Sequence, residues 1–307
     1  MTTRPNAVPE TPLESQTVAP AGMPPTQPLY WLVRRELWEN RSIYVAPLVV
    51  AAVFLAGFLI SLIHLPAKIR AALSLSPAQQ HEIIEQPYDL ASLLLMGAMV
   101  IVAAFYCLDA LYGERRDRSI LFWKSLPVSD LMTVLSKASI PMIILPLVIF
   151  AITVVTQFLM LLLSSVVLLG SGLNIAMLWT HLSFFHMSVM LLFHLVAIHG
   201  IWYAPFYGWL LLVSAWARRA PFLWGVLPPF AICVVERHVF SSSHFCAVLQ
   251  NRFMGGPSGV ASAPGSMSMD ALTPANFLSS PGLWIGLGVT AVFLAAAVRL
   301  RRYREPI

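Results

Sequence analysis

The chain has 307 residues, of which 58% are hydrophobic and only 11% are charged. Its mean hydropathy is +0.76, and soluble domains carry about 25% charged residues, so the composition excludes a water-soluble protein. The formal net charge is +5, but the basic residues are scattered between apolar runs and form no single face, which excludes a nucleic-acid-binding protein.

The first segment, residues 1–28, contains seven prolines and no apolar run. It is predicted to be a disordered cytoplasmic tail without a cleavable signal peptide. The remainder of the chain, residues 29–304, is expected to form one transmembrane domain. At its start, Leu29, Val33 and Leu37 recur at every fourth position beside three aromatic residues and three arginines. This pattern predicts a short helix lying on the inner leaflet of a membrane.

Membrane-spanning helices need about 20 mostly apolar residues. Six segments are predicted to span: residues 45–63, 90–112, 140–168, 184–216, 220–240 and 281–298. No Asp, Glu, Lys or Arg occurs between Ala138 and Ala217, so this stretch must fold back, and we place the turn at 170–174. Gly200, Pro205 and Gly208 are expected to interrupt the fourth span. The predicted fold class is an all-α integral membrane protein, a six-helix transmembrane bundle.

The positions of Lys and Arg predict the orientation of these spans. With the N-terminus inside, 15 of the 19 basic residues lie on the inner side of the membrane, which is the distribution that the positive-inside rule requires. We therefore expect a multi-pass protein of the bacterial inner (plasma) membrane with both termini cytoplasmic. Residues 64–89 and 241–280 are expected to be outer loops, and Glu236 and Arg237 are candidates for an outer gate.

The inner loop over residues 113–137 is unusual because it holds apolar residues between charged ones. Ile120, Leu121, Phe122, Trp123 and Leu126 have no spanning role, and apolar side chains rimmed by charge are typical of a helix that docks into a partner. Pro127 ends this unit, and Ser129 is expected to cap the next helix. The alternative is an amphipathic loop resting on lipid headgroups.

Around this loop the chain resembles the ABC-2 type of ABC transporter permease. The elements that carry the resemblance are Glu114-Arg115, Ser119, the apolar run Ile120–Trp123, Leu126-Pro127-Val128-Ser129, and Lys137 at the opening of the third span. It extends to the turn Ser214–Pro221 and to the six-span layout, and it covers roughly residues 29–302.

The resemblance implies the permease subunit of an ABC exporter that moves an unidentified substrate across the inner membrane. A separate ATP-binding subunit would bind ATP and Mg²⁺ and dock under the loop, and a second permease copy or a homologue would complete the complex. The ATPase-coupling residues implied are Glu114, Arg115, Ser119, Ile120, Leu121, Phe122, Trp123, Leu126 and Pro127.

The sequence itself predicts no enzyme activity, because it has no catalytic, cofactor-binding or metal-binding motif. GxxxxGK[ST] and HExxH are both absent, and the three cysteines form no metal or disulfide pattern. Thr153, Thr156 and Gln157 are polar residues within a span that either line a path or hold helices together. Two alternative functions stay open, a secondary transporter and a haem- or metal-binding membrane subunit. A carboxylate at the midplane would favour the first, and facing histidines would favour the second.

Overall fold

The computed structural model describes residues 26–72, 74–119, 129–172, 178–179, 183–255 and 274–303. Within those ranges every regular element is helical and no strand occurs. Six helical segments are long and apolar enough to cross a membrane: Ser42–Ala71, Gln79–Arg116, Asp130–Gly170, Phe184–Trp202, Pro221–Val239 and Pro281–Tyr303. The predicted fold class, an all-α membrane bundle, is confirmed. The predicted tail, residues 1–28, lies almost entirely outside the described residues.

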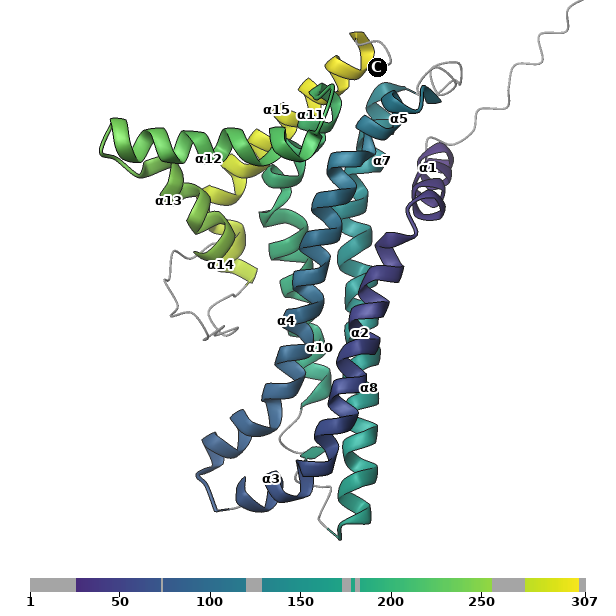
Figure 1. Cartoon of the computed structure of the whole chain (residues 1–307), viewed down its shortest axis with the longest axis vertical. Coiled ribbons are helices and arrows are strands. Elements are labelled where there is room, and N and C mark those ends of the chain that lie inside the picture. The colour runs from purple at the N-terminus through teal and green to yellow at the C-terminus, as the bar shows by residue number, and fades with distance from the viewer. Residues whose placement is uncertain are drawn as a thin grey trace, which may run out of the picture.

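Three long helices run side by side along the longest axis of the molecule (Figure 1). They are α2 (Ser42–Ser61), α4 (Pro77–Ala110) and α8 (Leu145–Gly170), and each packs against the other two. Leu95, Met99 and Ile149 are fully buried between helices of this bundle. α8 continues a helix that begins with α7 (Asp130–Ser139) and passes through a π-helical segment, η2 (Ile140–Ile144). As predicted, the chain turns directly after Gly170.

The fourth span is interrupted where the sequence predicted. α10 (Phe184–His194) passes into a π-helical segment, η3 (Leu195–Trp202), before α11 (Ala204–Trp216) begins. Gly200 lies so close to η2 that an added Cβ would stand 2.5 Å from the backbone oxygen of Met142. Only glycine fits this contact between two backbones. The π-helical segments η2 and η3 therefore pack directly against each other.

Both predicted outer loops contain helices, which corrects the sequence-based expectation. Residues 64–89 form α3 (Leu65–Ala72) and the first turns of α4, whose start is fixed by a capping box between Ser76 and Gln79. Residues 241–280 include α13 (His244–Gln250), a π-helical turn η4 (Asn251–Gly255) and α14 (Pro274–Ser279). Residues 256–273 lie outside the described part of the chain.

α12 (Pro221–Val239), the fifth predicted span, runs across the bundle instead of along it (Figure 1). The change of direction follows Ala220, whose φ of 47° is left-handed. Gly225, the only residue of α12 that is buried, packs against Leu108 and Leu210. α12 therefore contacts the bundle through its first turns, where Phe222 stacks on Phe105 and Trp224 packs against Trp216, and leaves most of its apolar surface uncovered.

Candidate functional site

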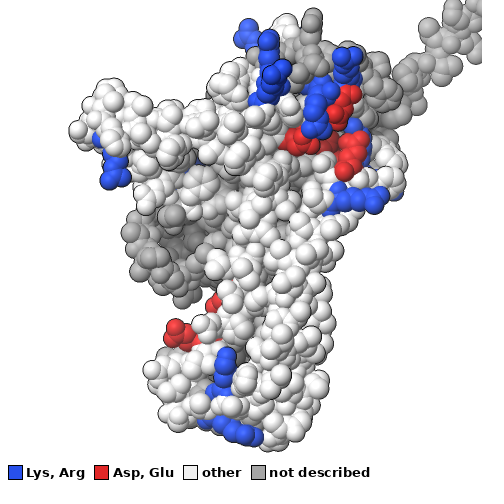
Figure 2. Space-filling view, viewed as in Figure 1, with Lys and Arg blue, Asp and Glu red and all other residues white. Residues whose placement is uncertain are grey.

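One end of the molecule collects most of its visible charged side chains (Figure 2). At this end lie α1 (Thr26–Glu39), α5 (Tyr112–Arg116), α7 and the C-terminal end of α15 (Pro281–Tyr303) (Figure 1). These elements place three acidic and three basic side chains close to one another. They are Glu36, Glu114, Asp130, Arg115, Lys137 and Arg301. We call these six residues the charge cluster. All but Asp130 are buried.

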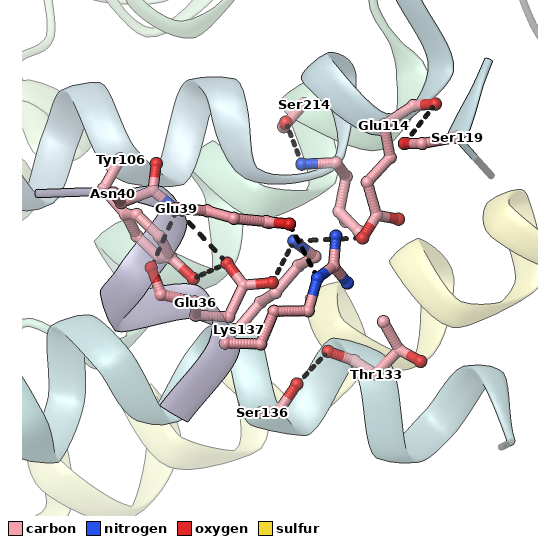
Figure 3. A network of polar contacts seen from close by, with 12 residues as sticks. Glu36, Glu39, Asn40, Tyr106, Glu114, Ser119, Thr133, Ser136, Lys137 and Ser214 are labelled. Carbon is pink, nitrogen blue, oxygen red and sulfur yellow. Dashed lines mark hydrogen bonds and ion pairs between the residues drawn. The ribbon is translucent and has the colours of Figure 1, made fainter. Parts of the chain in front are cut away.

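Lys137 stands at the centre of the charge cluster (Figure 3). Its Nζ lies 2.7 Å from Glu36 Oε1 and 3.2 Å from Glu114 Oε1, and its side chain is only 3% exposed. The single ammonium group therefore joins α1 to α5 through α7. Its partners are 101 and 23 residues away in the sequence, so the contact exists only in the folded chain.

Glu114 connects the cluster to the C-terminal helix, α15. Its second carboxylate oxygen lies 3.2 Å from Nη2 of Arg301, whose Nε lies 3.7 Å from Asp130 Oδ1. Asp130 also stands in the first turn of α7, where a negative charge is favoured by the helix dipole. Both ends of the predicted coupling loop, Glu114 and Asp130, thus bind the same arginine.

Glu36 has further partners on α4 and directly after the end of α1. Tyr106 of α4 donates a hydrogen bond of 2.9 Å to Glu36 Oε2, and Asn40 Nδ2 stands 3.5 Å from the same oxygen. A buried carboxylate with a cation and hydrogen-bond donors around it keeps its charge at a lower free-energy cost. Glu36 therefore anchors α1 to the bundle, although its position interrupts the apolar side of that helix.

Arg115 binds the end of α11. Its guanidinium donates hydrogen bonds to the carbonyl oxygens of Ala215 and Ala217, the second at 3.2 Å. These carbonyls lie at the C-terminus of α11, where backbone acceptors lack helical partners and a cation is favoured. Ser214 Oγ accepts hydrogen bonds from the amides of Leu111 at 3.0 Å and Tyr112 at 2.9 Å. The two sequence stretches that carry the family resemblance are thus in direct contact.

The predicted coupling residues divide into two groups. Glu114 and Arg115 are buried in the charge cluster, and Ser119 donates a 3.4 Å hydrogen bond to the carbonyl of Glu114. Ile120, Leu121, Phe122, Trp123, Leu126 and Pro127 lie outside the described residues. The predicted N-cap after the loop is confirmed, because Ser129 Oγ accepts a 3.2 Å hydrogen bond from the amide of Met132.

No protein family, curated protein or solved structure matches this chain. The function must therefore be argued from the residues themselves. Within the described residues no group of three or more His, Cys, Asp or Glu side chains is placed to hold a metal ion. The charge cluster connects helices that are far apart in the sequence, because its paired charges come from different helices.

The other polar candidates have structural partners. Gln157, fully buried on α8, donates hydrogen bonds to Ser92 Oγ at 2.8 Å and to the carbonyl of Tyr88 at 3.3 Å, both on α4. The hydroxyls of Thr153 and Thr156 bond to carbonyls of their own helix. Gln157 therefore holds two helices together, which is one of the two roles that the sequence left open.

Glu236 and Arg237, the candidates for an outer gate, lie near the end of α12. Glu236 accepts backbone hydrogen bonds from Phe245 at 2.9 Å and Cys246 at 3.2 Å, so it caps the N-terminus of α13. Arg237 is exposed. The contacts of Glu236 explain the helical hairpin α12–α13, and the gate stays a prediction.

Proposed function

We propose that this chain is the membrane-spanning permease subunit of an ABC-2 type exporter, driven by a separate ATP-binding subunit. The observation that carries the proposal is that the charge cluster holds both ends of the 113–137 loop. Glu114 precedes the apolar run of the loop and Asp130 follows it, and both lie against Arg301 of α15. A subunit that pushes on this loop would therefore move α1, α7 and α15 together.

The geometry of the cluster suits the transmission of force. Lys137 joins Glu36 and Glu114 while buried, and breaking a buried ion pair costs about 3–5 kcal/mol. Arg115 ties the same loop to the end of α11. Because these contacts are costly to break, the linked helices are expected to move as a unit when a partner displaces the loop.

The remaining parts of the proposal come from the sequence. The proposed location is a bacterial inner membrane, and the Lys and Arg distribution supports an orientation with the charge cluster on the cytoplasmic side. There an ATP-binding subunit has access to the loop, and it supplies the bound ATP and Mg²⁺ that this chain has no motif to hold. The family resemblance adds a second permease copy or a homologue as the other partner.

The docking surface is tested by Trp123→Glu. An aromatic residue that anchors an interface contributes about 2 kcal/mol or more, roughly thirtyfold in affinity. The neighbouring gene is first checked for a Walker A protein, which is then co-expressed with this chain and co-purified through a tag on the chain. We expect Trp123→Glu to lose the ATP-binding subunit and substrate-stimulated ATP turnover, while the amount of this chain in the membrane is unchanged.

Tyr303→Glu is the matched control, because Tyr303 is an exposed aromatic residue at the same end of the molecule but outside the loop. It should retain the partner at the wild-type level. Wild-type co-purification and turnover in both Trp123→Glu and Leu121→Glu would show that the loop is not the docking site.

A further inference from the structure

A large cavity lies in the half of the bundle remote from the charge cluster. It has a volume of about 920 Å³ and is lined by residues of α2, α3, α4 and α8, in the size range of small-molecule sites. α3 lies across the end of the space between α2 and α4 (Figure 1). The cavity is therefore bounded by helices on its sides and by α3 at the end predicted to face outward.

The polar residues that line the cavity are gathered toward one of its ends. Val49 and Val53 of α2 face Leu90 and Leu94 of α4 in the part nearest the middle of the bundle. Toward the other end the lining also contains polar residues, Ser61, Lys68, Gln86, Tyr88 and Ser164, which lie among the apolar Leu65, Ile69, Ile83 and Ile84. Tyr88 and Ser164 are both buried at 2% exposure. The cavity thus has an apolar inner part and an outer part in which polar groups and one cation are added to an apolar lining.

Among the residues that the structure describes, Lys68 is the only charged one that lines the cavity. It is exposed on α3, and among the described residues it forms no ion pair. A lone cation at the polar end complements an anion at that position. Apolar side chains below it complement a hydrocarbon chain.

We propose that this cavity binds an anionic amphiphile, with its acyl chain between α2 and α4 and its acidic head group beside Lys68. The chain would run along the bundle axis, as an acyl chain does in the outer leaflet of a bilayer. As a statement about substrate class this rests on the proposed exporter function, but binding by the purified chain needs no ATP-binding subunit. The two proposals can therefore fail separately.

Gly57 offers a direct way to fill the cavity. It lines the cavity, and an added Cβ meets no atom within 4 Å. Gly97 is a matched control, since it is also helical with open space around an added Cβ but does not line the cavity. Gly57→Trp should therefore occupy the site without a backbone clash, while Gly97→Trp places the same side chain elsewhere.

The experiment measures binding of radiolabelled oleate to the purified, delipidated chain, with phosphatidylglycerol or phosphatidylcholine vesicles as competitors. We expect Gly57→Trp to lower oleate affinity at least about tenfold, while Gly97→Trp stays at the wild-type value. Competition by phosphatidylglycerol would identify a bilayer lipid as the source of the ligand. Oleate binding without such competition would identify a free single-chain acid, and both results support an anionic amphiphile.

The head-group contact is tested by Lys68→Glu, with Arg70→Glu as its control on the same helix. Arg70 is exposed and does not line the cavity. Replacing the cation by an anion should weaken oleate binding roughly tenfold in Lys68→Glu only. Unchanged oleate affinity in Gly57→Trp, or phosphatidylcholine competing as strongly as phosphatidylglycerol, would overturn the proposal. If a cavity variant loses oleate binding while the ATP-binding subunit still co-purifies with it, the lipid site and the coupling loop act independently.

Discussion

Lys137 is the residue on which the charge cluster depends most. Its side chain is 3% exposed, and its ammonium has two carboxylate partners, Glu36 and Glu114. Removing water from a charge costs several kcal/mol, and only close opposite charges return that free energy. Without Lys137, two buried carboxylates would lose the cation that they share, and Glu114 would keep its contact with Arg301. The stability of this end of the bundle is therefore concentrated in one side chain.

We predict that Lys137→Met destabilises the purified chain by about 3–5 kcal/mol, because the methionine fills the space but leaves Glu36 and Glu114 without their shared cation. Thermal unfolding in detergent measures the effect. The double variant Lys137→Met with Glu36→Gln should recover part of the loss, since it removes one of the stranded charges.

The exposed pair Arg116–Asp117 provides the comparison. Its atoms are 3.0 Å apart, yet both side chains are more than half exposed, and exposed ion pairs contribute little to stability. Arg116→Met should leave the unfolding temperature close to the wild-type value. Equal effects of Lys137→Met and Arg116→Met would mean that the cluster does not hold the helices together.

At the scale of elements, the sequence was most informative where a single residue decides the backbone. The turn after Gly170, the break near Gly200 and the cap at Ser129 could all be placed from local chemistry. The helices in residues 64–89 and 241–280 were not predicted. The polar composition of these segments indicates that they do not span, but it does not distinguish a helix from a loop.

The direction of α12 could not be predicted either. Its hydropathy and length satisfy the requirement for a span, whereas its direction depends on the left-handed backbone at Ala220 and on the close contact of Gly225 with Leu108 and Leu210. Neither feature could be predicted from the sequence. Ala rarely adopts a left-handed backbone, and the hydropathy pattern does not show which residues Gly225 packs against.

The candidate site was predicted in part. Glu114, Arg115 and Lys137 belong to the motif that carries the family resemblance, but nothing in the sequence pairs them with Glu36 or Arg301. Those partners are brought together from opposite ends of the chain by packing. One signal was available, since Glu36 interrupts the apolar side of its helix, and a charge in such a position requires a partner.

The contact between η2 and η3 gives an element-scale prediction. In Gly200→Ala the new Cβ would stand 2.5 Å from the backbone oxygen of Met142, so the two π-helical segments must move apart. Overpacking of this kind costs about 1–3 kcal/mol. We expect a lower thermal unfolding temperature for Gly200→Ala, measured on the purified chain.

Gly288→Ala is the control for this substitution, because an added Cβ there meets nothing within 4 Å. Alanine is favoured over glycine inside a helix by roughly 0.5–1 kcal/mol, so Gly288→Ala should be neutral or stabilising. If Gly200→Ala were also neutral, η2 and η3 would not be in the close contact that the structure shows.

At the scale of the whole molecule, the two candidate sites lie at opposite ends of the same helices. α4 carries Tyr106, which binds the charge cluster through Glu36, and also Leu90 and Leu94, which line the cavity. α8 follows directly from the helix that carries Lys137 and reaches the cavity at Ser164. Continuous helices therefore link the 113–137 loop to the cavity, and packed elements of this kind can carry energetic coupling between distant sites.

This arrangement demands that the two ends of the bundle face opposite sides of the membrane. Single cysteines introduced at Ser74, Arg219 and Tyr303 test it, in a chain whose Cys233 and Cys246 are replaced by serine. Ser74 lies between α3 and α4. Arg219 follows the end of α11, and Tyr303 is the last residue of α15. All three positions are exposed.

Because positive residues gather at the charge-cluster end, that end is expected to be cytoplasmic. A membrane-impermeant thiol reagent added to intact cells should modify only Ser74→Cys, and Arg219→Cys and Tyr303→Cys should react only after the membrane is opened. Modification of Tyr303→Cys in intact cells would place the charge cluster outside, beyond the reach of any cytoplasmic ATP-binding subunit, and the exporter proposal would then be wrong.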